Sequence, residues 1–174
     1  VGLDVHLDAL RRQLELAAEL GLPVIVHCRQ ADERVLEMLQ AHWGEGQLRA
    51  VMHCFSGDEK LARGVIALGF FVSLAGSLTY PKARPTRRAA ELAPDDRILI
   101  ETDSPHLPPQ SARGKRCEPA MIGETADKLA AVRKVSRGDI ERITERNFRL
   151  AFGLPLIRKE VLLYPIRESV SYTH

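Results

Sequence analysis

Hydrophobic and polar positions follow two alternating patterns along this chain, and together they predict a repeating order of strands and helices. Short apolar runs bounded by polar, glycine or proline residues have the length and composition of buried strands. These runs stand at residues 23–28, 49–55, 70–76 and 98–100. Between them, apolar residues recur at the three- and four-residue spacing of amphipathic helices. We therefore expect parallel strands, each followed by a helix.

The ends of the helices are also marked in the sequence. We expect a strand end and loop at Gly2–Asp4, then helices that contain residues 7–20, 32–41, 59–68, 89–93, 119–130 and 136–152. Ser56 and Glu59 have the spacing of a capping box for the third helix. The segment 81–88, with four positive charges, is expected to be a loop before a short helix. Ser136 and Asp139 are expected to cap the last helix, which ends at Gly153.

Three of the predicted strands end in residues that bind metals in many proteins. His27 and His53 are 26 residues apart, and Asp103 lies 50 residues further on. One strand–helix unit with its loops takes about 25 residues, so these intervals equal one unit and two. Functional residues at the carboxyl ends of successive parallel strands are typical of a (β/α) barrel. Neutral imidazole and carboxylate are ligands of divalent metals such as zinc or manganese.

The run Ile98–Pro105 carries two carboxylates on one face. Side chains alternate along a strand, so Glu101 and Asp103 point the same way and Thr102 points to the other face. Buried carboxylates are costly unless a cation or hydrogen bonds receive them. The alternative interpretation is structural: a strand end with a capping aspartate, together with core histidines whose nitrogens are satisfied by hydrogen bonds.

Three motifs in this order resemble the TatD-type metal-dependent deoxyribonucleases, which belong to the amidohydrolase-like hydrolases. The motifs are PVIVHCR, VMHCFSG and ILIETDSP, the last followed by RGK and EP, and the resemblance runs from Val1 to about Leu154. It implies that His27 and His53 bind one divalent metal and that Asp103 binds a second. It also implies hydrolysis of phosphodiester bonds, with removal of nucleotides from DNA in the 3′ to 5′ direction.

Other motifs of that family are not found in this chain. Family members begin with a strand that carries His-x-His, and a later strand carries Gly-Glu-x-Gly-Leu-Asp, whose Glu bridges the metals. The chain opens Val1-Gly2-Leu3-Asp4 and so resembles the C-terminal half of a member, with three of six expected protein ligands. We expect an α/β fold, a partial (β/α)8 TIM-type barrel of about four parallel units, over residues 1–153. Residues 154–174 have no family counterpart.

The expected chemistry assigns a role to each candidate residue. Asp103 would bind metal and accept a proton from the attacking water. Arg29 lies two residues after His27, on the same face, and could clamp a phosphate; the alternative is an ion pair with Asp32 or Glu33. Arg113 and Lys115, in the long loop 104–118, are further phosphate-binding candidates. Zinc, magnesium and manganese are not distinguished by these residues.

Composition and net charge indicate the general class of protein. The chain has 174 residues, 45% hydrophobic and 28% charged, which is typical of a globular domain. Its longest apolar stretch is shorter than the roughly 20 residues that span a bilayer, so no membrane partner is expected. A net charge of +2 indicates no large basic surface. Cys28 and Cys54 follow the two histidines, so we expect them to point into the strand–helix layer, and free thiols suit a reducing cytoplasm.

We therefore expect a metal-dependent phosphodiesterase with DNA as its substrate and with impaired activity in the chain as given. Two alternatives remain at this point: a hydrolase of a small ester or amide, and an inactive barrel fragment that acts only by association. The strands at residues 24–26 and 98–100 would be unpaired sheet edges with an inner face open to water. We expect self-association through these edges, or cover from residues 154–174. Gly76 is expected to admit the substrate backbone.

Overall fold

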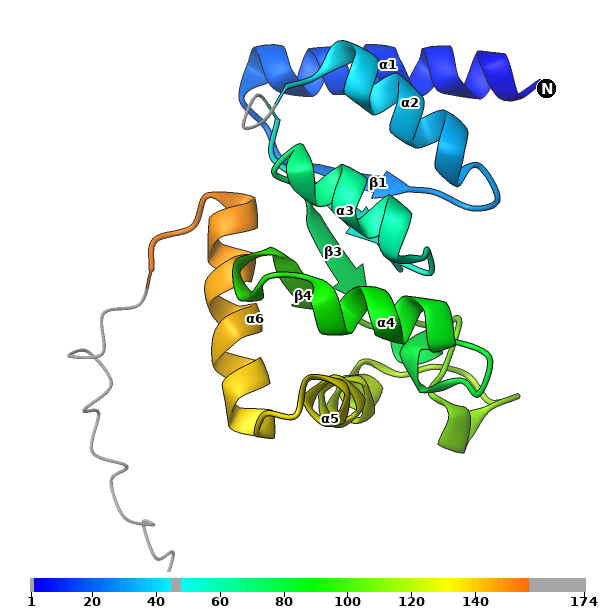
Figure 1. Ribbon diagram of the computed structural model, residues 1–174, viewed down its shortest axis with the longest axis vertical. Coiled ribbons are helices and arrows are strands. Elements are labelled where there is room, and N and C mark those ends of the chain that lie inside the picture. Colours follow the sequence, from blue (N-terminus) through cyan, green and yellow to red (C-terminus); the bar gives the residue numbers. More distant parts are fainter. Residues whose placement is uncertain (1, 45–47, 157–174) are drawn as a thin grey trace, which may run out of the picture.

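Strands and helices alternate in the computed structural model, which describes residues 2–44 and 48–156 (Figure 1). The strands are β1 (Val24–His27), β2 (Ala50–His53), β3 (Phe71–Leu74) and β4 (Ile98–Ile100). The helices are α1 (Leu3–Leu20), α2 (Asp32–His42), α3 (Glu59–Ala67), α4 (Arg84–Leu92), α5 (Ile122–Arg133) and α6 (Arg137–Phe152). Short 3-10 turns are η1 (Gly76–Thr79), η2 (Asp95–Arg97), η3 (Gln110–Ala112) and η4 (Pro119–Met121).

The four strands form one parallel sheet in the order β1-β2-β3-β4. The predicted strand–helix order is thereby confirmed. The register of β1 on β2 makes the Cα atoms of His27 and His53 direct partners. Within the described part of the chain, β1 and β4 are the edge strands, as expected.

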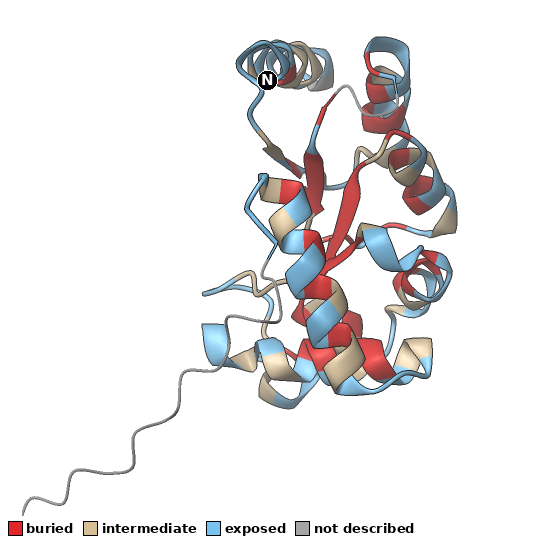
Figure 2. Ribbon diagram, turned by 90° about the vertical axis from the view of Figure 1, so that its left-hand side faces the viewer, coloured by how far each residue is buried: buried red, intermediate tan, exposed pale blue. Residues whose placement is uncertain are grey.

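The outer face of the sheet packs on the helices and forms the main core. Val26, Met52, Val72 and Ile98, one from each strand, are at most 2% exposed in this core. Figure 1 shows the helices in chain order from α1 to α5 along the sheet. In Figure 2 the strands β2 and β3 are the most continuously buried part, and the helices are buried on one side only. Each fully buried Leu or Ile contributes roughly 1.5–3 kcal/mol to this packing.

The inner face of the sheet is partly covered by α6. Val51, Phe71 and Leu99 form a second buried cluster with Ala151 near the end of that helix. The side-chain amide of Asn147 fastens α6 to β4, because it donates to the carbonyl oxygens of Asp95 and Ile98, both at 2.7 Å. The expectation of an inner face open to water is therefore wrong for the middle of the sheet. It holds at β1, where Ile25 is 60% exposed.

Several helix ends differ from the expectation. Helix α1 begins at Leu3, with Asp4 in its first turn, where a carboxylate interacts favourably with the helix dipole. Helix α3 is capped by Asp58, whose carboxylate accepts from the Leu61 N–H at 3.1 Å, so the box of Ser56 and Glu59 is wrong. Helix α4 already begins at Arg84, because the following proline suits a first turn. The expected loop at 81–88 is thus shorter.

Both ends of α6 agree with the expectation. Ser136 and Asp139 form the capping box, and Gly153 ends the helix in the left-handed conformation, with φ of 67°. Most of the segment 154–174 lies outside the described residues, so its expected covering role stays a prediction. Among the helices that the structure describes, none has both the length and the apolar character needed to cross a bilayer.

Candidate metal centre

The parallel register brings the predicted histidines together at the carboxyl ends of β1 and β2. The ring centroids of His27 and His53 are 6.0 Å apart, with 38° between the ring planes. The backbone N–H of Glu101 donates to the Leu74 carbonyl at 2.9 Å and extends the pairing of β4 with β3 by one residue. Glu101 and Asp103 therefore reach the same end of the sheet as the two histidines.

His53 lies between two carboxylates. Its Nδ1 atom is 2.8 Å from Oε1 of Glu101, and its Nε2 atom is 3.3 Å from Oδ1 of Asp103. The three side chains are between 21% and 26% exposed, so water reaches them only in part. His53 and Asp103, which the resemblance assigned to different metals, therefore lie next to each other, and Glu101 lies on the other side of the His53 ring.

Glu101 is itself held by two donors besides the imidazole. The Ser73 hydroxyl donates to Oε2 at 2.8 Å, and the backbone N–H of Cys54 donates to Oε1 in a short hydrogen bond. Cys54 has a φ of 48°, in the left-handed region, and this turn directs its N–H at the carboxylate. A carboxylate held in this way fixes the orientation of the histidine ring beside it.

The donor and acceptor roles of the two His53 nitrogens indicate a place for a cation. A carboxylate only accepts hydrogen bonds, so the Nδ1 atom that faces Glu101 carries a proton. In the neutral ring, Nε2 then has a lone pair that faces the Asp103 oxygen. Two such acceptor atoms face each other favourably only when a second proton or a cation lies between them. An imidazole nitrogen next to a carboxylate oxygen is also the donor type that divalent ions bind.

The donors present are an incomplete ligand set. Among residues 2–44 and 48–156, no group of three or more His, Cys, Asp or Glu side chains is arranged to hold a metal ion. The Nε2 atom of His53 and the Oδ1 atom of Asp103 are donor types that divalent ions bind, and the two atoms face each other. The His27 ring lies beside the His53 ring. Further ligands are needed to complete the coordination shell, as the three expected ligands out of six already implied.

A cavity of about 730 Å³ opens over this group. It is lined by His27, Cys28, Arg29, His53, Cys54, Ser56, Ser77, Asp103, His106 and Leu107. Arg29 therefore lies at the site, and the alternative, an ion pair with Asp32 or Glu33, is not found among the described residues. Asp32 instead accepts a hydrogen bond from the Cys28 thiol at 3.4 Å.

The two cysteines were expected to point away from the site, and this is wrong in part. Cys28 packs against the main core, yet both thiols line the cavity. Burial raises the pKa of Cys54 to about 12, and the charges of Asp103 and Glu101 add to the rise. Burial, followed by the hydrogen bond to Asp32, raises the pKa of Cys28 to about 11. Both thiols therefore stay protonated at neutral pH.

The long loop 104–118 forms one wall of the cavity and is docked on η1. A Cβ atom on Gly76 would lie 2.7 Å from the Leu107 carbonyl oxygen and 2.9 Å from the Pro109 nitrogen. The Gln110 N–H donates to the Thr79 hydroxyl at 2.8 Å. Gly76 thus admits a loop of the chain itself, where substrate backbone was expected.

Arg113 and Lys115 are not among the cavity-lining residues. The guanidinium carbon of Arg113 lies 4.1 Å from the centre of the Tyr80 ring. The Tyr80 hydroxyl donates to the Pro108 carbonyl at 2.8 Å. Lys115 follows on the same loop and is exposed. The expected contact of these two side chains with phosphate therefore stays a prediction.

Sequence reasoning did not assign roles to Glu101 and Ser73. The strand alternation placed Glu101 on the face of Asp103, and the same alternation puts Ser73 on the inner face of β3. A polar residue on an otherwise apolar inner face was the available signal. Leu107 lines the cavity from a loop without periodic pattern, so no such signal marked it, and His106 of the same loop lines the cavity as well.

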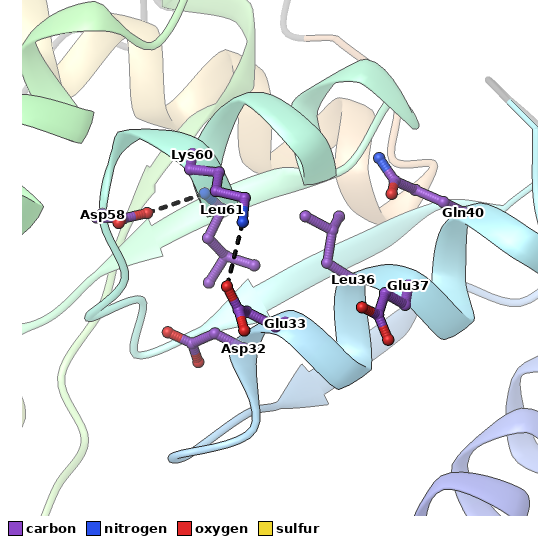
Figure 3. A pocket seen from close by; sticks show the side chains of 8 residues that line it. All are labelled: Asp32, Glu33, Leu36, Glu37, Gln40, Asp58, Lys60 and Leu61. Carbon is purple, nitrogen blue, oxygen red and sulfur yellow. Dashed lines mark hydrogen bonds and ion pairs between the residues drawn. The ribbon is translucent and has the colours of Figure 1, made fainter.

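A second hollow, of about 320 Å³, lies between α2 and α3 (Figure 3). Four carboxylates line it, from Asp32, Glu33, Glu37 and Asp58, with Leu36 and Leu61 between them. Its one cation, Lys60, makes an ion pair with Glu33 at 3.1 Å. A hollow with this surplus of negative charge repels phosphate and other anions.

Comparison with known proteins adds a family match. The profile of the family described as TatD related DNase matches residues 3–153. The metal-dependent hydrolase YabD of Bacillus subtilis is 35% identical over 151 residues, which are 87% of this chain and 59% of that protein. The 3′-5′ ssDNA/RNA exonuclease TatD of Erwinia tasmaniensis is 35% identical over 84% of this chain and 58% of its own length.

Solved structures agree with these relatives. YjjV, a TatD homologue from Escherichia coli K12, is 30% identical with a TM-score of 0.77, over 84% of this chain and 56% of that one. A TatD family hydrolase from Entamoeba histolytica, 18% identical with a TM-score of 0.72, shares the fold. The chain spans less than three fifths of the length of the curated relatives named above.

Proposed function

Because the chain belongs to the TatD-related DNase family and forms part of a (β/α)8 barrel, we propose that it contributes to a metal-dependent hydrolase of phosphodiester bonds in DNA. The observation that carries this proposal is the position of His53 between Glu101 and Asp103, beside the ring of His27. The direction of cleavage follows the relative in Erwinia tasmaniensis, whose name is that of a 3′-5′ exonuclease. We propose the same polarity for this protein.

Each residue of the site has a role in this proposal. His27, His53 and Asp103 would hold divalent metal, together with ligands beyond these three. Glu101 would keep the His53 ring in the orientation that presents Nε2 to the cavity. Asp103 would also accept the proton of the attacking water. A divalent ion at this place supplies Lewis-acid chemistry, which activates water and holds phosphate oxygens.

The positive charge of Arg29 in the cavity lining favours a substrate with a phosphate group over a neutral substrate. Its side chain is exposed, lines the cavity and has no ion-pair partner among the described residues. A guanidinium forms two parallel hydrogen bonds with phosphate oxygens and stays charged at every pH of interest. The small ester or amide of the alternative hypothesis has no use for this cation.

The test is hydrolysis of a single-stranded oligonucleotide, labelled at its 5′ end, by the purified chain with Mn²⁺, Mg²⁺ or Zn²⁺. We expect slow shortening from the 3′ end that stops with EDTA and with Asp103→Asn. The rate should be low, because an incomplete ligand set leaves the charge and geometry of the site incomplete. Cleavage that survives both EDTA and Asp103→Asn would contradict the proposal.

Two outcomes decide between the alternatives. Hydrolysis of p-nitrophenyl acetate, faster than that of any phosphodiester and lost in Asp103→Asn, would favour the small-ester hydrolase. Absence of metal binding, measured by calorimetry, would favour a fragment that acts only by association. The free thiols of Cys28, Cys54 and Cys117 are in keeping with the reducing cytoplasm that we propose as its location.

A further inference from the structure

Positive side chains without an acidic partner gather in the loops at the carboxyl ends of the strands. Most arginines of the described residues form ion pairs, several of them along the helices. No ion pair is found, within residues 2–44 and 48–156, for a set in the loops after β1, β3 and β4 and at the first residue of α4. The set comprises Arg29, Lys82, Arg84, Arg113, Lys115 and Arg116. All six are exposed.

Tyr80 joins two of these loops into one surface. Its backbone carbonyl accepts from the Ala83 N–H at 3.1 Å, which folds Lys82 and the start of α4 back toward it. Its hydroxyl donates to Pro108 at 2.8 Å, and Arg113 lies over its ring. Segment 82–84 is therefore attached to the backbone of Tyr80, and Arg113 of the long loop contacts its ring.

The loops that carry these cations also contribute residues to the cavity. Ser77 of η1 and Leu107 of the long loop line the cavity, and each lies three residues or fewer from a residue of the Tyr80 contacts. Nearby acidic groups are Glu118 at the end of the loop and Glu124, which accepts from the Ser111 hydroxyl at 2.5 Å. Even with these two acids counted, the positive side chains of segments 82–84 and 113–116 outnumber the negative ones, in contrast to the acidic hollow between α2 and α3.

Resting on the proposed function, we propose that Lys82, Arg84, Arg113, Lys115 and Arg116 bind a single-stranded nucleic acid beyond the scissile bond. The exposed lysines and arginines would contact successive phosphates. The guanidinium carbon of Arg113 lies 4.1 Å from the centre of the Tyr80 ring, and this exposed planar group would offer a place for stacking on a base. We call these five residues and Tyr80 the rim surface.

Single strands fit this arrangement better than other polyanions. Sequence-tolerant binding of single strands combines a row of cations with planar groups on which bases stack, and the rim surface has both. An acidic peptide offers negative charge without bases, so it would use the cations and leave the Arg113 plane without a partner. The net charge of +2 concealed this surface, because it averages over the paired charges of the helices.

Binding of fluorescein-labelled oligo(dT) in EDTA, followed by anisotropy over a salt series, tests the proposal without any hydrolysis. The double variant Lys82→Gln/Lys115→Gln should bind several-fold more weakly. Each lost phosphate contact on a single strand lowers the slope of log affinity against log salt by about 0.7, so the slope should fall by about 1.4. The matched control Lys134→Gln/Arg146→Gln removes two exposed cations elsewhere and should leave both quantities unchanged.

Arg113→Lys tests the stacking separately. It keeps the charge but removes the planar group, so the salt slope should hold while the preference for oligo(dT) over an abasic oligonucleotide of equal length should shrink. Equal loss of affinity in the control double variant would overturn the proposal. So would oligoglutamate that competes as well as oligo(dT) at equal charge.

A small substrate separates this proposal from the proposed function. Bis(p-nitrophenyl) phosphate offers neither a row of phosphates nor bases to the rim surface, so its hydrolysis by the parent chain reports on the proposed function alone. If the chain binds oligo(dT) through the rim surface but hydrolyses nothing, the proposed function fails and the rim surface stands. If oligo(dT) is cleaved and the double variant binds it normally, the rim surface fails alone.

Discussion

Glu101 holds the imidazole of His53 by its Nδ1 atom, with 2.8 Å between that nitrogen and Oε1. This contact leaves Nε2 as the nitrogen that faces Asp103 and the cavity. Because the carboxylate is in turn held by Ser73 and Cys54, three strands cooperate to orient one ring. The orientation of His53 is thus set before any ligand binds.

Glu101→Gln should weaken metal binding while leaving the fold intact. The amide oxygen can still accept from the Cys54 N–H, and the NH2 group can donate to the Ser73 hydroxyl, but the amide carries no charge and so holds the proton on Nδ1 less strongly. Loss of such an outer contact typically lowers metal affinity about 10–100-fold. Calorimetric titration with Zn²⁺ or Mn²⁺ measures the effect, and Glu19→Gln, an exposed acid of α1, is the control. Equal affinities for parent and Glu101→Gln would remove Glu101 from the site.

Asp103→Asn should abolish the stabilisation that metal confers. An ion that binds only the folded chain stabilises it by about 2.7 kcal/mol when present at 100 times its dissociation constant. The variant loses the carboxylate that faces Nε2 at 3.3 Å, so thermal unfolding should no longer respond to added metal. Without metal, the melting temperatures should be similar. A metal-dependent rise that persists in Asp103→Asn would show that the ion binds elsewhere.

The two cavity thiols should make the chain less stable at alkaline pH. Their pKa values, about 12 for Cys54 and about 11 for Cys28, lie above the ordinary value of 9.0. As the pH rises, the unfolded chain therefore releases these protons first, and the free energy of unfolding falls. The loss begins near pH 9 and grows as the pH approaches 11 and 12. Urea unfolding from pH 8 to 11 should show a shallower decline for Cys28→Ala/Cys54→Ala.

Gly76→Ala should detach the long loop from η1. The added methyl group would meet the backbone of Leu107 and Pro109 at less than 3.0 Å, and backbone yields at a cost of roughly 1–3 kcal/mol. Gly138→Ala in α6 is the control, since its nearest neighbour would lie 3.6 Å away. That change should be neutral or stabilise the helix by roughly 0.5–1 kcal/mol. Unfolding in urea compares the two, and equal stability would contradict the docking of the loop.

Self-association should occur through the β1 side of the sheet. Ile25 is 60% exposed and borders a groove of about 470 Å³ together with Phe148 and Phe152 of α6. An edge strand with exposed apolar side chains is a template for pairing. Ile25→Lys should shift sedimentation toward the monomer, whereas Val5→Lys, at an equally exposed position of α1, should not. A parent chain that stays monomeric at all concentrations would refute this prediction.

The parts of the site that lie on strands were predictable, and the reason is periodicity. The alternation of side chains and the interval of 26 residues placed His27 and His53 at one height, and the register confirms this. Glu101 was placed on the correct face as well. Its role was not predictable, because only the assembled sheet shows that its carboxylate meets Ser73, Cys54 and His53 at once.

The parts that were missed lie where periodicity ends. Cys54 comes directly after a strand, and its left-handed backbone turns the side chain out of the alternation that was expected to hide it. Ser56 and Asp58 both have side chains that can cap the start of α3. In the structure the cap is Asp58, and the sequence alone does not distinguish the two. The cover that α6 provides over the inner face depends on Asn147, a polar residue that no helical pattern would assign to a core.

His27 and His53 are direct partners in the register of β1 on β2. An insertion or deletion within either strand would therefore remove one of the two histidines from the site. Removal of one residue within β2 would turn His53 into the helix layer and bring its neighbour to the cavity, since successive residues face opposite sides. A residue added to the turn between α3 and β3, at the opposite end of the sheet, would leave that pairing untouched. Length variation among natural versions of this chain should therefore fall almost wholly in such turns.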